Sequence, residues 1–127
     1  MNKRDDNVLP FQRKIPIQNL DQFTYHHTLA AQRGTSVVMF TKSGCQSCAM
    51  WIKLLTQFKT QHQATTVFRV DTERDPGLAR ELDLFHLPAL FLYRDGEYHA
   101  ALQSEAKLDK FAAAVEAALG APAQEHP

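Results

Sequence analysis

The chain has 127 residues, of which 44% are hydrophobic and 22% charged, a composition that suits one globular domain rather than a disordered segment. It carries 14 basic and 14 acidic residues, so its formal net charge of zero provides no long-range field to attract nucleic acid or an anionic membrane. No apolar run approaches the roughly 18 residues of a membrane span, and Asp5 and Asp6 stand where the apolar core of a secretory signal would begin, so we expect a cytoplasmic protein.

The first elements alternate between extended and helical patterns. Residues 15–17 are suited to a short first strand, and Asn19 is a residue type that caps helix N-termini. A helix is therefore expected to run through Leu29 and to end before Gly34. Residues 36–40 are a compact apolar run of strand length, which is typical of a strand buried on both faces of a sheet.

A helix is expected from Cys45 onward, because large apolar side chains recur there at the spacing of one helix face. These side chains are Trp51, Leu54, Leu55 and Phe58. Residues 65–71 are rich in strand-forming types and follow that helix. Asp75 before Pro76 combines an N-cap with proline at the first helical position, which predicts a short helix to about Asp83.

The last third of the chain predicts a hairpin and a helix. Residues 89–93 form another apolar strand, and Asp95-Gly96 is a strong two-residue turn signal, so residues 97–102 should pair antiparallel with that strand. Ser104 is expected to cap a final helix that Gly120 ends. Its apolar stripe consists of Leu108, Phe111, Ala112, Val115 and Leu119.

The resulting order is β-α-β-α-β-α-β-β-α, which predicts an α/β domain with a mixed sheet and helices on both faces. We expect the domain to span residues 14–120, between a flexible N-terminal arm, 1–13, and a flexible C-terminal tail, 121–127. A neutral surface and a single complete sheet favour a monomer.

Two cysteines stand three positions apart, directly after the strand at 36–40 and at the start of a helix. In this setting a C-x-x-C pair is informative, because both sulfurs lie on the first helical turn within bonding distance. The helix start favours an anion, so we expect the pKa of the Cys45 thiol to lie below its usual value of about 8.5. Cys48 shares a helix face with Ile52 and Leu55 and should be more buried. Cys45 is therefore the candidate nucleophile, and Cys48 the resolving residue, of thiol–disulfide exchange.

Three other interpretations of the pair are a zinc site, a structural staple and an inert disulfide. A structural zinc site needs about four ligands, but a second C-x-x-C is absent and the histidines lie in unrelated segments, so we expect no metal. These histidines are His26, His27, His62 and His86. A disulfide closing so short a loop adds little stability, so a purely structural staple is disfavoured. An inert pair that never cycles remains an alternative.

The C-x-x-C pair is followed by two further motifs. Val70-Asp71 precedes Asp75-Pro76-Gly77 at the expected start of a short helix, and residues 87–97 have the sequence LPALFLYRDGE. In this order, over residues 15–119, the three motifs resemble the thioredoxin family. The resemblance implies a thioredoxin fold and a protein-disulfide oxidoreductase without a bound cofactor. It also implies disulfide-containing protein substrates, and a thioredoxin reductase as a candidate electron donor.

The resemblance further implies which residues meet the substrate. A cis peptide bond would precede Pro88, and the backbone at Leu87 would pair with the extended substrate chain in the manner of strand addition. Gly44 and Gln46, beside the cysteines, would contribute to the same surface. His86 is either an exposed loop residue or a group that contacts the partner or stabilises the thiolate.

The chain departs from the thioredoxin pattern around the cysteines. The replacements are Gln46-Ser47 for the usual Gly-Pro, Gly44 for a tryptophan, Thr41 for another aromatic, Met39 for a buried aspartate and Arg69 for a lysine. Arginine does not give up a proton in proteins. The proton-transfer apparatus is therefore missing or rebuilt, and the reduction potential is expected to differ from that of an ordinary thioredoxin.

Three functions remain to be separated. The first is exchange or reduction of protein disulfides through Cys45 and Cys48. The second is a thioredoxin-fold module that docks extended peptides, with vestigial or regulatory redox activity. The third, a glutathione-dependent enzyme of the glutaredoxin type, is disfavoured because the segment after Pro88 lacks a Gly-Gly-Asp type of motif.

Overall fold

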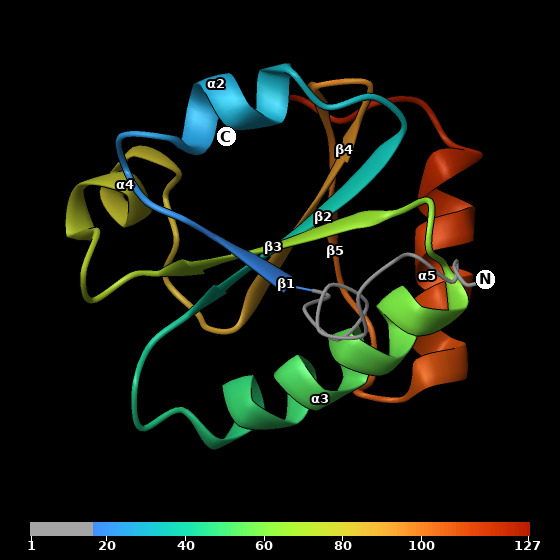
Figure 1. Cartoon of the computed structure of the whole chain (residues 1–127), viewed down its shortest axis with the longest axis horizontal. Helices are drawn as coiled ribbons and strands as arrows, with labels where there is room; N and C mark the ends of the chain where they lie inside the picture. The colour runs from blue at the N-terminus through green and yellow to red at the C-terminus, as the bar shows by residue number, and fades with distance from the viewer. Residues whose placement is uncertain (1–16) are drawn as a thin grey trace, which may run out of the picture.

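The computed structural model describes residues 17–127, which form a five-stranded sheet with helices on both faces (Figure 1). The strands lie in the order β1-β3-β2-β4-β5. Their bounds are β1 Ile17–Leu20, β2 Thr35–Thr41, β3 Thr66–Asp71, β4 Ala89–Arg94 and β5 Glu97–Leu102. β1, β3 and β2 run parallel, while β4 and β5 are antiparallel to their neighbours. The predicted mixed sheet and the order of its elements are confirmed.

The helices divide between the two faces of the sheet and enclose two separate clusters of buried side chains. Their bounds are α2 Tyr25–Ala30, α3 Gln46–Gln61, α4 Pro76–Glu81 and α5 Leu108–Leu119. Trp51 and Phe58 of α3 pack with Phe111 of α5 on one face. Tyr25 of α2 and Leu78 of α4 belong to the cluster on the other face. None of the helices formed by residues 17–127 combines the length and the hydrophobicity that crossing a membrane requires.

The first strand and helix differ from the sequence-based expectation. Residues 1–13, and residues 15 and 16 of the expected strand, lie outside the described residues. Asn19 does not cap a helix, because it belongs to β1. The chain instead turns at Asp21, whose Oδ1 accepts hydrogen bonds from the backbone N–H groups of Phe23 and Thr24, both 2.9 Å. Asp21 thus satisfies the backbone N–H groups that precede α2, and the helix itself begins four residues later, at Tyr25.

Two other helix ends also differ. Ser104 does not cap the last helix: its hydroxyl donates to the carbonyl of Glu105 at 2.7 Å, and α5 begins at Leu108. Asp75 and Pro76 stand at the start of α4 as expected, although the Asp75 side chain makes no capping hydrogen bond. α4 ends at Glu81 rather than Asp83.

The hairpin and the last residues complete the sheet edge. Asp95 and Gly96 both have positive φ, 51° and 84°, as a tight turn between β4 and β5 requires. The pairing of β4 with β5 shifts register between Leu92 and Tyr93 of β4, which pair with Ala100 and Tyr98 of β5. Residues 121–127 contain no helix or strand, and Gln124 lies along β5 with its backbone N–H donating to the His99 carbonyl at 2.7 Å.

Candidate active site

The two cysteines lie where β2 ends and α3 begins. The loop between these elements turns at Gly44, whose φ of +76° is readily adopted only by glycine. Cys45 is the N-cap residue of α3 and has extended backbone angles. Its Sγ accepts a hydrogen bond of 3.1 Å from the backbone N–H of Cys48. One of the unpaired N–H groups at the helix start therefore points at the first sulfur.

Cys45 and Cys48 form a disulfide, with their Cα atoms 5.2 Å apart. The two residues differ in exposure, since Cys45 is half-buried while the side chain of Cys48 is only 3% exposed. One accessible sulfur next to one sheltered sulfur is the asymmetry that stepwise disulfide exchange requires. Gly44 and Gln46, which flank Cys45, are exposed.

The loop before β4 brings a second segment to the sulfurs. The peptide bond between Leu87 and Pro88 is cis, and both residues are half-buried. The carbonyl oxygen of Leu87 lies 4.0 Å from the Sγ of Cys45, although the two residues are 42 positions apart in the chain. His86 is exposed and lines a groove beside this loop. The structure thus gathers Cys45, Leu87 and Pro88 at one place and sets His86 at its margin.

The positions that differ from the thioredoxin pattern carry no proton relay. Met39 is fully buried in β2, opposite Arg69 of β3 and Leu90 of β4. Arg69 is half-buried, and its Nε donates to Thr41 Oγ1 at 3.3 Å. A thioether has no titratable proton and a guanidinium is a hydrogen-bond donor without acceptor capacity, so neither side chain offers a proton acceptor.

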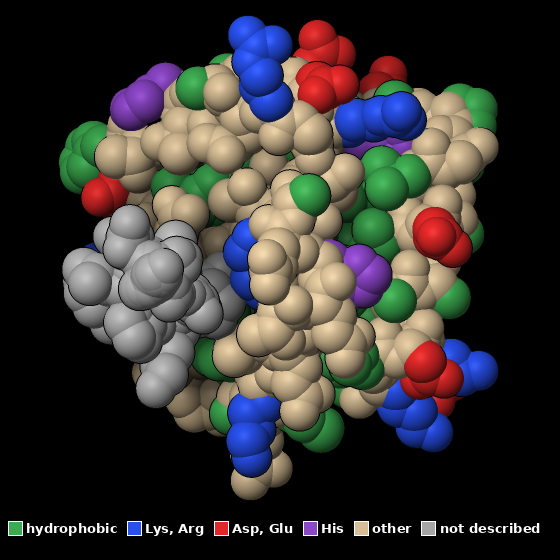
Figure 2. All heavy atoms as spheres, turned by 45° about the vertical axis from the view of Figure 1, so that its right-hand side comes forward, with side chains coloured by type: hydrophobic (Ala, Val, Ile, Leu, Met, Phe, Trp, Pro, Cys, Tyr) green, Lys and Arg blue, Asp and Glu red, His purple; other side chains and the backbone are tan. Residues whose placement is uncertain are grey.

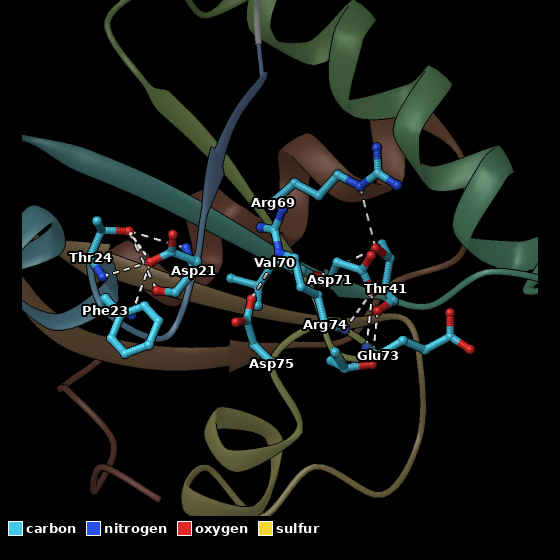
Figure 3. A network of polar contacts seen from close by, with 11 residues as sticks. Asp21, Phe23, Thr24, Thr41, Arg69, Val70, Asp71, Glu73, Arg74 and Asp75 are labelled. Carbon is cyan, nitrogen blue, oxygen red and sulfur yellow. Dashed lines mark hydrogen bonds and ion pairs between the residues drawn. The ribbon is translucent and has the colours of Figure 1, made fainter.

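Polar contacts that the sequence does not predict hold the loop before Cys45, and Figure 3 shows those around Thr41 and Asp71. The backbone N–H and the hydroxyl of Thr72 both donate to the carbonyl of Thr41, at 2.8 and 2.9 Å. The Glu73 carboxylate accepts from both the backbone N–H and the hydroxyl of Ser43. The loop after β3 therefore fixes the loop after β2, two residues before Cys45.

Other candidate residues are structural. Trp51 is buried and meets Phe111 edge to face, with ring centroids 5.3 Å apart, as expected for a core residue. His26 pairs with Glu81 at 2.8 Å on the exposed face of α2. Within residues 17–127, no group of three or more His, Cys, Asp or Glu side chains is placed to hold a metal ion.

Comparison with known proteins identifies the family. The family model for thioredoxin matches residues 16–117, which is most of the chain. The chain belongs to the thioredoxin family. A thioredoxin-fold domain with a close cysteine pair supports thiol–disulfide oxidoreductase activity in general. No curated protein sequence matches the chain.

Two solved structures are similar to this thioredoxin-family chain. Thioredoxin f2 from Chlamydomonas reinhardtii aligns with a TM-score of 0.71 and 23% identity, covering 80% of this chain and 94% of its own. The second is a chain from a structural study of the thiol resolving mechanism in yeast mitochondrial 1-Cys peroxiredoxin via glutathione/thioredoxin systems. It aligns with a TM-score of 0.63 and 21% identity, covering 70% of this chain and 84% of its own. At these identities the similarity establishes the fold.

Proposed function

We propose that this chain exchanges disulfides of protein substrates through a Cys45–Cys48 dithiol/disulfide, in the direction of substrate reduction. In the reduced chain, the Cys45 thiolate attacks one sulfur of the substrate disulfide, and the other substrate sulfur leaves as a thiolate. Cys48 then attacks Cys45 Sγ and releases the second substrate sulfur. Two electrons pass to the substrate, and the chain is left as the Cys45–Cys48 disulfide.

The position of Cys45 at the start of α3 is the observation that carries this proposal. Its sulfur is accessible and accepts the Cys48 N–H at 3.1 Å. It also lies at the positive end of the dipole of a 16-residue helix. Both effects stabilise a thiolate relative to a thiol, and the thiolate is the nucleophile of disulfide exchange.

The backbone at Leu87 and Pro88 is the proposed seat of the substrate. An extended substrate segment that pairs with Leu87 would bring its own cysteine sulfur toward Cys45, because the Leu87 carbonyl is 4.0 Å from Cys45 Sγ. Gly44 and Gln46 flank Cys45, and His86 precedes Leu87; all three are exposed and complete the proposed contact surface. A thioredoxin reductase is the proposed electron donor.

A single-turnover experiment tests the exchange. Pre-reduced chain is mixed with a disulfide-linked peptide, and the released thiol is quantified without a reductase. We expect one equivalent of disulfide to be reduced, no reaction with Cys45→Ser, and a trapped mixed disulfide on Cys45 with Cys48→Ser. Reduction by Cys45→Ser at the wild-type rate, or no reduction by the wild-type chain, would contradict the proposal.

A peptide-binding module without turnover is the second candidate. The observation that favours it is the presence of Met39 and Arg69, which leaves the buried Cys48 without a proton acceptor at these two positions. In this case Cys45→Ser would bind protein partners as tightly as the wild type, while the wild-type chain would fail the single-turnover assay.

A further inference from the structure

A groove of about 460 Å³ opens beside the cysteines, between α4 and the loop that precedes β4. Leu87 is shared between the groove and the active site, because it lines the groove and its carbonyl lies 4.0 Å from Cys45 Sγ. Lys42, from the loop that leads to Cys45, lines the groove on another side. An extended chain paired with Leu87 would therefore pass along or into this groove.

Three basic side chains line the groove, and two of them, Lys42 and Arg80, are cations. The three are Lys42 before α3, Arg80 on α4 and His86 in the loop, and all are exposed. Neither an aspartate nor a glutamate lines the groove. Among ion pairs between described residues, none involves Lys42 or Arg80. Five acidic residues adjoin lining residues in the sequence but do not line the groove. The carboxylates of four of them have partners: Asp71 with the Glu73 backbone, Glu73 with Ser43, Asp75 with Arg74 and Glu81 with His26. The fifth, Asp83, is exposed.

The charge of the groove lining differs from that of the chain as a whole. The sequence as a whole has 14 basic and 14 acidic residues. On the face shown in Figure 2, Lys, Arg, Asp and Glu side chains are interspersed over the surface without a large patch of one sign. The lining of the groove, with Lys42 and Arg80 and without a carboxylate, therefore differs from the mixed charges of the face that Figure 2 shows.

The groove also offers apolar surface. Phe85 is 80% exposed, which makes it one of three large hydrophobic side chains that the described residues leave open to solvent. Leu84 and Leu87, on either side of Phe85 and His86, are half-buried in the groove wall. A large exposed apolar residue next to a reactive site is typical of a contact surface, because its burial by a partner is favourable.

We propose that this groove selects substrate segments that carry carboxylate side chains and an apolar residue close to the reactive cysteine. Lys42 and Arg80 attract the carboxylates, and Phe85 covers the apolar residue. The inference rests on the proposed disulfide exchange and specifies its substrate class: acidic, extended segments of disulfide-containing proteins. Exposed ion pairs are individually weak, so the selection is expected to appear as a rate preference rather than as an absolute requirement.

Three matched peptide disulfides test the proposal. Each is a symmetrical disulfide of the same apolar-flanked peptide, with two Asp, two Asn or two Lys at fixed positions near the cysteine. The pre-reduced full chain reduces each in a single turnover, and each rate is divided by the rate with dithiothreitol to remove intrinsic differences in disulfide reactivity. We expect the acidic peptide to react about five- to tenfold faster than the neutral one, as two exposed ion pairs allow. The basic peptide should be the slowest.

Reversing the charges of Lys42 and Arg80 tests whether the groove causes the preference for acidic peptides. The double variant Lys42→Glu/Arg80→Glu is expected to invert the order, so that the basic peptide reacts fastest. Lys110→Glu is the matched control, because Lys110 is exposed on α5, which covers the face of the sheet opposite α4. This control should keep the wild-type ratio of rates. High salt should bring the ratio for the wild-type chain toward one, since it screens exposed charges.

The possible results distinguish a wrong substrate preference from a wrong proposal of disulfide exchange. Equal normalised rates for all three wild-type reactions would overturn the acidic preference and leave disulfide exchange intact. A preference that Lys110→Glu abolishes, or that the double variant retains, would also overturn the role of the groove. Failure of the wild-type chain to reduce any of the peptides would refute the proposed exchange itself.

Discussion

A buried pair of tyrosine hydroxyls offers a sharp test of how the fold is held together. Tyr25 of α2 is fully buried, Tyr93 of β4 is 4% exposed, and their hydroxyl oxygens lie 2.7 Å apart. Tyr93→Phe would leave the Tyr25 hydroxyl buried without this partner. Tyr25→Phe would do the same to Tyr93. We expect each single change to lower the free energy of unfolding by about 1–3 kcal/mol, the usual cost of a buried polar group that loses its partner.

The double variant Tyr25→Phe/Tyr93→Phe removes both hydroxyls and leaves neither unpaired. Its loss of stability should therefore be smaller than the sum of the two single losses, by about 1–2 kcal/mol. Urea unfolding followed by circular dichroism gives all four free energies by linear extrapolation. If the double loss equals the sum within about 0.5 kcal/mol, the two hydroxyls act independently and the reasoning is wrong.

The same two tyrosines make the free energy of unfolding fall as the pH rises in the alkaline range. Burial raises the pKa of Tyr25 and of Tyr93 above the usual value, because the charged phenolate is poorly solvated inside the fold. In the unfolded chain both phenols ionise near pH 10. Their contribution to stability is therefore complete below about pH 10 and is lost as the pH rises further. The double variant should show a shallower decline above this pH, and the remaining slope includes Tyr98, whose pKa burial also raises.

Three further changes have effects of known sign. Trp51→Ala should cost about 3–5 kcal/mol in a urea titration, because the indole packs edge to face on Phe111 in the core. Ser36→Ala should stabilise the chain by about 1 kcal/mol, because the buried Ser36 hydroxyl has no hydrogen-bond partner within the described part of the chain; a loss of stability would show that it has one. Gly96→Ala should lower the melting temperature by several degrees, since Gly96 has a φ of 84° and a Cβ there would collide with the Ala30 carbonyl.

Elements with local and unambiguous signals were predicted closely. The hairpin strand β5 was expected at residues 97–102 and lies at Glu97–Leu102, because Asp95-Gly96 fixes the turn and the first pairs that follow it, up to the register shift after Tyr93. The buried strand β2 extends the expected run 36–40 by one residue at each end. Apolar runs and tight turns are encoded within a few residues, so the sequence alone identifies them.

Helix starts were predicted less well, because several residue types compete for the same role. Asn19, Asp21 and Thr24 are all capable of capping a helix, and the sequence does not show that Asn19 is drawn into β1 by pairing with Arg69. Ser104 was also a reasonable cap by type, but its hydroxyl bonds the adjacent Glu105 carbonyl. In each case a contact outside the capping position decided which residue starts the helix.

The candidate site combines a part that sequence spacing reveals with a part that only topology brings together. Cys45 and Cys48 belong to one helical turn, so their proximity follows from a spacing of three. The contacts of Thr72 with Thr41 and of Glu73 with Ser43 depend instead on how the strands are arranged. β2 and β3 are parallel and pair Thr41 with Asp71, so the loops after both strands must leave the sheet at the same edge.

The charge of the groove cannot be predicted in the same way, because it depends on which face α4 turns toward the groove. Leu78 and Leu82, one turn apart, are buried, and this orients Arg80 of the same helix outward. The sequence predicts that orientation, but not that Arg80 lines the same groove as Lys42, which is 38 positions away along the chain, in the loop before Cys45. In the proposed recognition, substrate preference is set where two loops and a short helix line one groove. It can change by substitution of Lys42 or Arg80 while the cysteine pair and the sheet beneath it stay the same.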